Sequence, residues 1–201
     1  MVDPLAQLGA AFATSEVAFA AFAARTAGKR FATGDWLLRA GDRAEWCYFI
    51  ATGLVRELYI TADGVEHTRA FLAEGQLTGS LLDLLSDRPS VTWIQALEAV
   101  DAIAWRYRDL DGLCARFPEL HAVARRAAEQ LALRKVRREY ELLALSAAER
   151  RARWLSDQPA LDRRVSRRHL ASYLGVTPEH LSRLRSGRKP APRAAARPRS
   201  R

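Results

Sequence analysis

The chain of 201 residues is poor in cysteine and has no long hydrophobic run. Cys47 and Cys114 are too few for a disulfide framework, a four-cysteine zinc site or a cysteine-ligated iron–sulfur cluster. This usage predicts a reduced, cytoplasmic setting. No stretch is long enough to span a membrane. The alanine-rich start does not match a signal peptide, because it holds Asp3 and Glu16 and no early Lys or Arg.

Histidine and catalytic spacings are also scarce. His67 is the only histidine in the strand-rich region and has no His-x-His neighbour, while His121, His169 and His180 fall on expected helices. These facts disfavour a metal-holding jelly roll of the cupin type. No paired carboxylates or nucleophile–base spacing stands out. We therefore expect a protein that is not an enzyme, with no metal site and no cofactor.

Charge is abundant but unevenly placed. Residues 1–114 hold 10 Lys and Arg against 15 Asp and Glu, and residues 115–201 hold 22 against 8, so the two parts carry −5 and +14. An acidic module joined to a strongly basic one indicates a sensing or interaction part followed by a polyanion-binding part. A basic surface that is merely solvated is the alternative.

Residues 166–187 have the pattern of a helix-turn-helix. Ser166 can cap a first helix, Gly175 can end it in the left-handed conformation, and Thr177 and Pro178 supply the cap and first turn of a second helix. The second helix directs Leu181 and the later Leu184 inward and a mostly cationic face outward, which fits a major groove. An ordinary helical hairpin with the same caps is the alternative.

The region between residues 29 and 106 reads as short strands separated by turn signals. The apolar runs predict strands over 30–32, 36–39, 46–51, 54–60, 65–72, 91–96 and 102–106, with residues 79–86 helical between them. Two short helices, 5–12 and 16–24, precede this region. Such even spacing predicts a small antiparallel β-barrel or jelly roll, and therefore an α+β fold.

A long helix is expected from Pro118 to about Ala144, after a short one over 107–116. Its apolar residues form two stripes, of which the first is Leu120, Ala124, Ala127 and Leu131 and the second is Leu133, Val136, Tyr140 and Leu143. Two stripes imply two contacts, so we expect one with the barrel and one with the same helix of a second chain, with Leu131 in that seam. A helix buried within a single subunit is the alternative.

The predicted organisation has four parts. Residues 1–116 form an effector domain, 117–145 a dimerisation helix, 146–187 a helix-turn-helix domain whose first helix is capped by Ser146, and 188–201 a tail of Arg, Ala and Pro. The tail holds almost no large apolar residue, so we expect it to be disordered. It either attracts phosphate or is an inert terminus.

From about residue 15 to 187 the sequence resembles the Crp/Fnr family of bacterial transcription regulators. The order of parts agrees, and several stretches carry the resemblance: Ala40-Gly41-Asp42, Tyr48 to Arg56, Gly75 to Ser80, Ala96-Leu97-Glu98, Phe117 to Leu120 and His169 to Glu179.

The resemblance implies a cyclic-nucleotide-binding-like sensor, a homodimer joined by the long helix, and binding to double-stranded DNA, with RNA polymerase as a further partner. By position, Glu179 and Arg183 match the family's base-contacting residues, and we expect the nearby cations to meet phosphates. The predicted DNA-binding residues are Arg167, Arg168, Thr177, Glu179, Ser182, Arg183, Arg185 and Arg188.

The predicted effector pocket departs from that of the cyclic-nucleotide-binding members. Gly79-Ser80 stands where they have Gly-Glu, and Ser90-Val91 where they have Arg-Ser or Arg-Thr, with Arg88 two positions early. Lys135 and Val136 stand where the cyclic-AMP-binding members use two hydroxyls. We therefore expect cyclic AMP not to bind in the usual way, and a small-molecule anion is a candidate effector. The candidate pocket residues are Gly79, Ser80, Arg88, Ser90 and Lys135.

Two further departures concern the ends of the chain. Nothing after Gly187 alternates apolar and polar residues, so we expect a helix-turn-helix without a β-hairpin wing. The oxygen-sensing branch uses an N-terminal cysteine cluster that this sequence lacks, so we do not expect that mechanism. A sensor module that works through a protein partner remains the alternative to a DNA-binding regulator.

Overall fold

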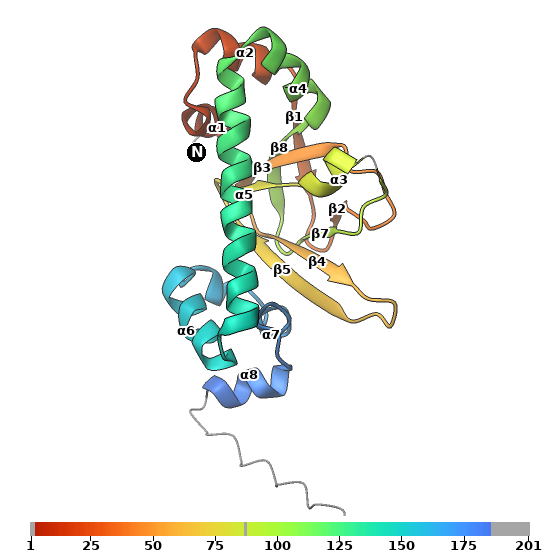
Figure 1. The fold of residues 1–201 in the computed structure, drawn as a ribbon, viewed down its shortest axis with the longest axis vertical. Helices are drawn as coiled ribbons and strands as arrows, with labels where there is room; N and C mark the ends of the chain where they lie inside the picture. The colour runs from red at the N-terminus through yellow and green to blue at the C-terminus, as the bar shows by residue number, and fades with distance from the viewer. Residues whose placement is uncertain (1–2, 87, 186–201) are drawn as a thin grey trace, which may run out of the picture. The chain divides into compact units, whose positions relative to one another are not determined.

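The computed structural model describes residues 3–86 and 88–185 (Figure 1). The chain divides into two compact units, of which the first ends at Ala144 and the second begins at Leu145. Each unit is described by itself. The predicted tail, Arg188 included, lies outside the described residues.

The first unit holds two four-stranded antiparallel sheets. One has the order β1-β8-β3-β6 and the other the order β2-β7-β4-β5. The jelly roll is thus confirmed, as two sheets. The bounds are β1 Thr26–Phe31, β2 Trp36–Leu38, β3 Trp46–Thr52, β4 Val55–Ile60, β5 Glu66–Leu72, β6 Leu77–Thr78, β7 Trp93–Ala96 and β8 Val100–Arg106.

Strands β3 and β8 are buried on both faces, which explains their nearly continuous apolar sequences. Successive side chains of a strand point to opposite faces. Tyr48 and Ile50 of β3 therefore enter the core between the sheets, whereas Phe49 enters a second core beneath the helices. On β8, Ala102 and Trp105 divide between the same two cores.

The helices of the first unit are α1 Pro4–Phe12, α2 Glu16–Ala23, α3 Leu81–Ser86, α4 Tyr107–Arg116 and α5 Glu119–Ala144. Asp3 caps α1 and Ser15 caps α2, because each side chain accepts a backbone N–H of the first turn. Phe12, Phe22 and Trp105 pack edge to face or tilted, which joins α1 and α2 to β8. This aromatic cluster fixes the helical layer on the sheet.

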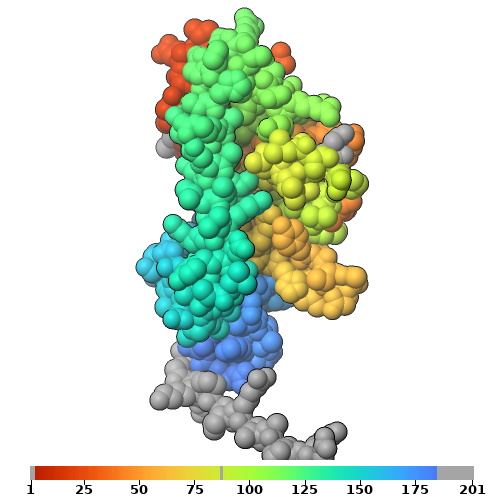
Figure 2. All heavy atoms as spheres, viewed as in Figure 1, coloured from red at the N-terminus to blue at the C-terminus, as the bar shows by residue number. Residues whose placement is uncertain are grey.

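The long helix α5 lies along the roll, as Figures 1 and 2 show. Leu120 and Val123 are buried in the helical core, and Leu131 lines cavities beside the roll. Leu131, expected in a seam with a second chain, therefore faces its own roll. The second predicted stripe is exposed instead, with Leu133 at 69%, Val136 at 64% and Tyr140 at 51%. In one chain, this stripe is an exposed apolar face of α5.

The second unit is helical throughout its described part. It contains α6 Ala147–Asp157, the 3₁₀ helix η1 Leu161–Arg163, α7 Arg167–Leu174 and α8 Pro178–Arg185. Ser146 and Glu149 form a capping box at the start of α6. A small core joins the helices, built from Trp154, Leu161, Val165, Leu170, Ala171, Leu174 and Leu181.

Sequence reasoning placed most of these elements and missed three features. Strand β1 begins at Thr26 rather than Arg30, and neither the two-residue strand β6 nor η1 was expected. Strand β1 is exposed along most of its length, so it lacks the apolar signal on which the prediction relied. No helix in the described part is both long and apolar enough to cross a membrane.

Candidate functional site

The predicted phosphate position is occupied by a buried polar cluster, which we call the Asp83 cluster: Ser80, Asp83, Ser90 and Thr92. The hydroxyls of Ser80 and Ser90 both donate to the same Asp83 carboxylate oxygen, at 2.6 Å each. Thr92 lies 3.1 Å from Ser80, oxygen to oxygen, and its backbone N–H donates to Ser90 at 3.0 Å. All four residues are at most 5% exposed. An internal carboxylate thus satisfies both predicted pocket serines.

The other candidate pocket residues stand outside the hydrogen bonds of the Asp83 cluster. Arg88 is exposed. Gly79 has φ +147°, a backbone conformation that favours glycine, and a Cβ there would lie in a tight contact 3.1 Å from the Trp46 carbonyl oxygen. Gly79 and Lys135 line two different cavities, described next.

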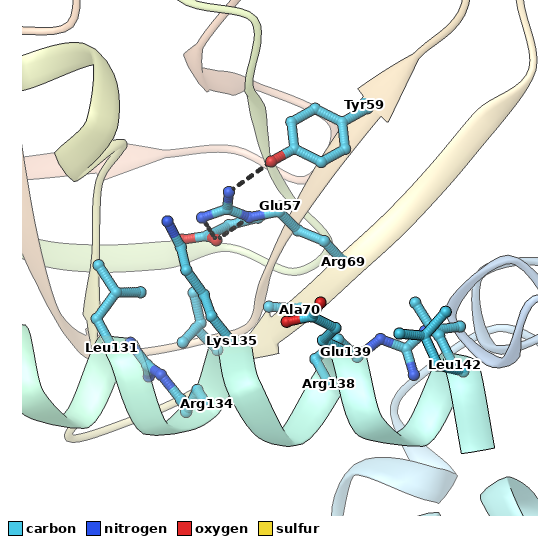
Figure 3. A pocket seen from close by; sticks show the side chains of 12 residues that line it. Glu57, Tyr59, Arg69, Ala70, Leu131, Arg134, Lys135, Arg138, Glu139 and Leu142 are labelled. Carbon is cyan, nitrogen blue, oxygen red and sulfur yellow. Dashed lines mark hydrogen bonds and ion pairs between the residues drawn. The ribbon is translucent and has the colours of Figure 1, made fainter. Parts of the chain in front are cut away.

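The first cavity, which we call the β4–β5 cavity, lies between β4, β5 and the C-terminal half of α5, with a volume of about 480 Å³ (Figure 3). Its floor is a buried ion pair. Glu57, only 4% exposed, accepts from Arg69 Nε at 2.8 Å and Nη2 at 2.7 Å, and from the Thr78 hydroxyl at 2.8 Å. Arg69 also donates to the Tyr59 hydroxyl at 2.8 Å. The carboxylate, the guanidinium and both hydroxyls of this floor therefore each have a hydrogen-bond partner.

A β-bulge presents Arg69 to this floor. In the pairing of β4 with β5, Glu57 lies opposite Ala70 and Leu58 opposite Thr68, so Arg69 is the extra residue. A bulge re-aims the side chain of its extra residue, and bulges are common beside functional sites. Sequence reasoning missed both Glu57 and Arg69. One sequence signal could have identified them. Glu57 and Arg69 are opposite charges that stand next to apolar residues in two consecutive strands, β4 and β5.

The wall opposite this floor comes from α5. Figure 3 shows Lys135 extending from α5 toward the Glu57–Arg69 pair. Arg134 also lines the cavity, and partial removal from water lowers the pKa of its guanidinium, against the raising effect of Glu57. The cavity therefore combines apolar surface with a cationic helix face.

The second cavity, which we call the α3 cavity, has a volume of about 210 Å³ and lies between α3, β6, α4 and α5. Its walls are mainly apolar side chains such as Leu77, Leu84 and Leu110. Cys47 lies in the wall, and desolvation raises the pKa of its thiol to about 12, so the thiol is neutral at physiological pH. This cavity suits an apolar group.

The helix-turn-helix of the second unit has the predicted caps. The Ser166 hydroxyl accepts the His169 N–H at 3.2 Å, and the Thr177 hydroxyl accepts the His180 N–H at 3.2 Å. Gly175 adopts the left-handed conformation, φ 67°, and the Val176 N–H bonds the Ala171 carbonyl at 3.0 Å. The turn is therefore held by a backbone hydrogen bond at the end of α7 and by the Thr177 side-chain cap at the start of α8.

A cation inside the second unit secures this turn. Arg150 Nε donates to the Leu174 carbonyl at 2.8 Å, and its Nη1 donates to the Leu145 carbonyl. Arg151 and the Trp154 indole N–H both bond Asp162, at 3.2 Å and 2.8 Å. These contacts tie α6 to α7 and to η1.

The outward face of α7 and α8 carries most of the predicted DNA-binding residues. Arg167, Arg168, Thr177, Glu179, Ser182 and Arg183 are all exposed, while Leu181 is 1% exposed. Backbone hydrogen bonding, the Thr177 hydroxyl and Arg183 lower the pKa of Glu179, so its carboxylate is ionised at neutral pH. Arg185 ends α8, and Arg188 lies outside the described residues. The face offers one anionic acceptor among cations.

In the described residues, no three His, Cys, Asp or Glu side chains are grouped so that they could hold a metal ion. His67 is exposed on β5.

Comparison with known proteins gives matches that agree with this layout. The family described as "Cyclic nucleotide-binding domain" matches residues 28–117. The fumarate and nitrate reduction regulatory protein of Vibrio cholerae is 29% identical over 169 residues, covering 75% of this chain and 64% of its own length. The chain thus spans less than two thirds of the length of this curated relative.

Two solved structures share the fold. FixK2 from Bradyrhizobium japonicum superposes with a TM-score of 0.71 at 20% identity, over 81% of this chain and 83% of that one. The c-di-GMP-responsive global regulator CLP of Xanthomonas campestris has a TM-score of 0.71 at 21% identity, over 86% and 91%. Together with the order of the elements, these similarities show that residues 28–117 form a cyclic nucleotide-binding domain and that the chain shares the fold of FixK2 and CLP.

Proposed function

We propose that this chain is a dimeric, cytoplasmic transcription regulator that reads DNA sequence with α8. The observation that carries the proposal is the division of α8 into two faces. Leu181 is buried in the core of the second unit, while Glu179, Ser182 and Arg183 are exposed together. A helix with one packed face and one exposed polar face fits the major groove of B-DNA.

The proposed base contacts follow from the donors and acceptors of α8. The ionised Glu179 carboxylate accepts from a cytosine amino group, and the Arg183 guanidinium donates two bonds to the O6 and N7 atoms of guanine. Each contact discriminates between bases by about 1–3 kcal/mol. Arg167 and Arg168, exposed in the first turn of α7, contact phosphates and set the register. Arg185 and Arg188 remain predicted phosphate contacts.

The uncovered apolar stripe of α5 supports a homodimer. Leu133, Val136 and Tyr140 follow an a/d heptad spacing and are more than half exposed in one chain. Two such helices side by side would bury this stripe, which stabilises by about 25 cal/mol per Å² of apolar surface. A two-fold dimer presents two copies of α8, and therefore reads a two-fold symmetric operator. Once the regulator is bound to its DNA operator, RNA polymerase is the expected protein partner.

The proposed sensor does not use cyclic AMP in the usual way. In the Asp83 cluster, the Ser80 and Ser90 hydroxyls already donate to a carboxylate, so they are not available to a phosphate. A phosphate placed there would also lie beside the Asp83 carboxylate, and like charges at such distances repel. Calorimetry that detects cyclic AMP binding at micromolar affinity would contradict this part of the proposal.

Selection of bound DNA from a random pool tests the regulator itself. We expect the purified full-length chain to enrich one motif with two-fold symmetry, and its specific complex to have the mass of a dimer. Enrichment of no motif, with salt-dependent binding to all sequences alike, would contradict the proposal. It would then favour a sensor module that acts through a protein partner.

A further inference from the structure

The β4–β5 cavity and the α3 cavity meet. Glu57, Leu131 and Arg134 line both of them, so these three side chains form the boundary between the two cavities. The first holds about 480 Å³ and the second about 210 Å³. Their chemistry differs, because the charged side chains are concentrated in the first and the apolar side chains dominate the second.

The β4–β5 cavity has an excess of positive charge, because its lining holds four cations, Arg69, Arg134, Lys135 and Arg138, against the two carboxylates of Glu57 and Glu139. Glu57 and Arg69 bond each other, and Arg138 pairs with Glu141 at 3.4 Å. Among residues 3–86 and 88–185, Arg134 and Lys135 have no carboxylate within ion-pair distance. Two neighbouring cations over a floor of satisfied polar groups attract an anion.

The α3 cavity has the opposite character. Apart from Glu57 and Arg134 at its junction with the first cavity, its walls hold no charged side chain. The Cys47 thiol in its wall is neutral, because burial raises the pKa of this thiol. A small apolar cavity binds hydrocarbon well and ions poorly.

We propose that the two cavities together bind an amphipathic organic anion, with its anionic head at Arg134 and Lys135 and its apolar body in the α3 cavity. This inference deepens the proposed function and rests on it, since it names the class of effector for the sensor domain. A single anionic head on an apolar chain or ring satisfies both ends of the site. A cyclic nucleotide does not, because its sugar and base would place polar atoms against the apolar walls.

Calorimetry on the full-length protein with three probes tests this proposal. Octanoate has both the head and the body, 1-octanol has the body alone, and acetate has the head alone. We expect octanoate to bind in saturable fashion, octanol at least about tenfold more weakly, and acetate not to saturate. Equal binding of octanol and octanoate would overturn the anion site. So would the absence of binding across straight-chain carboxylates from hexanoate to dodecanoate.

Variants locate the two ends of the ligand. The double variant Arg134→Gln/Lys135→Gln should weaken octanoate binding by about tenfold or more. The control Arg137→Gln removes one cation from the same helix outside both cavities and should leave the affinity within about twofold. Ala128→Phe places a larger side chain from α5 in the α3 cavity. It should weaken octanoate binding and leave the structure of the helix-turn-helix unchanged. Unchanged affinity in the double variant would overturn the proposal, and circular dichroism checks that each variant is folded.

DNA binding measured on the same samples separates the two proposals. If the chain selects a DNA motif but binds no carboxylate, this inference alone fails. If it binds octanoate at Arg134 and Lys135 but selects no motif, the regulator function fails and the ligand site stands. A cyclic dinucleotide that binds in place of every carboxylate would also overturn the ligand class.

Discussion

The two units of the chain use charged side chains in opposite ways. In the first unit, the charges on the floor of the β4–β5 cavity and in the Asp83 cluster are buried and bonded: Glu57 to Arg69, and Asp83 to two serine hydroxyls. In the second unit, the charges at the candidate DNA site stand on the exposed face of α7 and α8, as Arg167 and Arg183 do.

This difference separates two tasks. Removing one member of a buried ion pair leaves the other charge without either a partner or water, which destabilises the fold. Buried, paired charges therefore contribute to the structure. An exposed cation stays hydrated until a polyanion displaces its water and counter-ions, so it contributes to binding rather than to folding. The difference follows burial rather than the unit, because the second unit also holds an ion pair between the buried Arg151 and the half-buried Asp162.

The largest expected effect is on the floor of the β4–β5 cavity. Glu57→Gln leaves Arg69 without its counter-ion and should lower the free energy of unfolding of the full-length chain by about 3 kcal/mol in urea denaturation. Glu129→Gln is the matched control, because its ion pair with Arg125 is exposed and should be worth less than about 0.5 kcal/mol. Equal losses in the two variants would show that burial does not distinguish these pairs.

A smaller loss is expected in the Asp83 cluster. Asp83→Ala removes the acceptor of two buried hydroxyls and should lower the free energy of unfolding by about 2 kcal/mol. Asp83→Asn keeps an acceptor oxygen in place and should recover part of that loss. If Asp83→Ala were as stable as the wild type, the cluster would not hold α3 as described.

The uncovered stripe of α5 gives an effect on assembly rather than on folding. Val136→Glu places a charge in the proposed seam and should raise the dimer dissociation constant by about tenfold or more, which is about 1.4 kcal/mol. Analytical ultracentrifugation over a concentration series measures this constant. Arg137→Glu, one position away on the same helix, is the control. A Val136→Glu variant that dimerises like the wild type would place the seam elsewhere.

The smallest effect on stability is expected on α7. Arg167→Ala removes an exposed cation and should change the free energy of unfolding by less than about 0.5 kcal/mol. It should lower the affinity for all DNA sequences alike. It should also reduce the slope of the logarithm of the binding constant against the logarithm of the salt concentration by roughly one unit. Fluorescence anisotropy at several salt concentrations measures that slope. A selective loss for one sequence would make Arg167 a base contact.

Local signals in the sequence were enough to predict the caps and turns. Ser15, Ser146, Ser166 and Thr177 each cap the helix expected of them, because capping depends only on residues within one turn of the chain. The division of the strand residues between the two cores is also local, because successive side chains of a strand point to opposite faces of the sheet. These elements place the helix-turn-helix face where sequence reasoning expected it.

The effector site could not be predicted in the same way. Ser80 and Ser90 were identified by position, but their common partner Asp83 is found only once α3 and the following loop have folded back on each other. Arg69 reaches Glu57 through a bulge that has no reliable sequence pattern. The meeting of two cavities at Leu131 depends on how α5 packs on the roll, which is a property of the whole unit.

The most direct test of the account is the DNA motif selected by Arg183→Ala compared with that selected by the wild type. Glu179 and Arg183 stand one turn apart on the exposed face of α8, and the account assigns them to base edges. It predicts that Arg183→Ala relaxes the preference at one symmetric pair of positions and leaves the rest of the motif intact. An unchanged motif with affinity lowered uniformly for all sequences would make Arg183 a phosphate contact and contradict the proposed reading of DNA by α8.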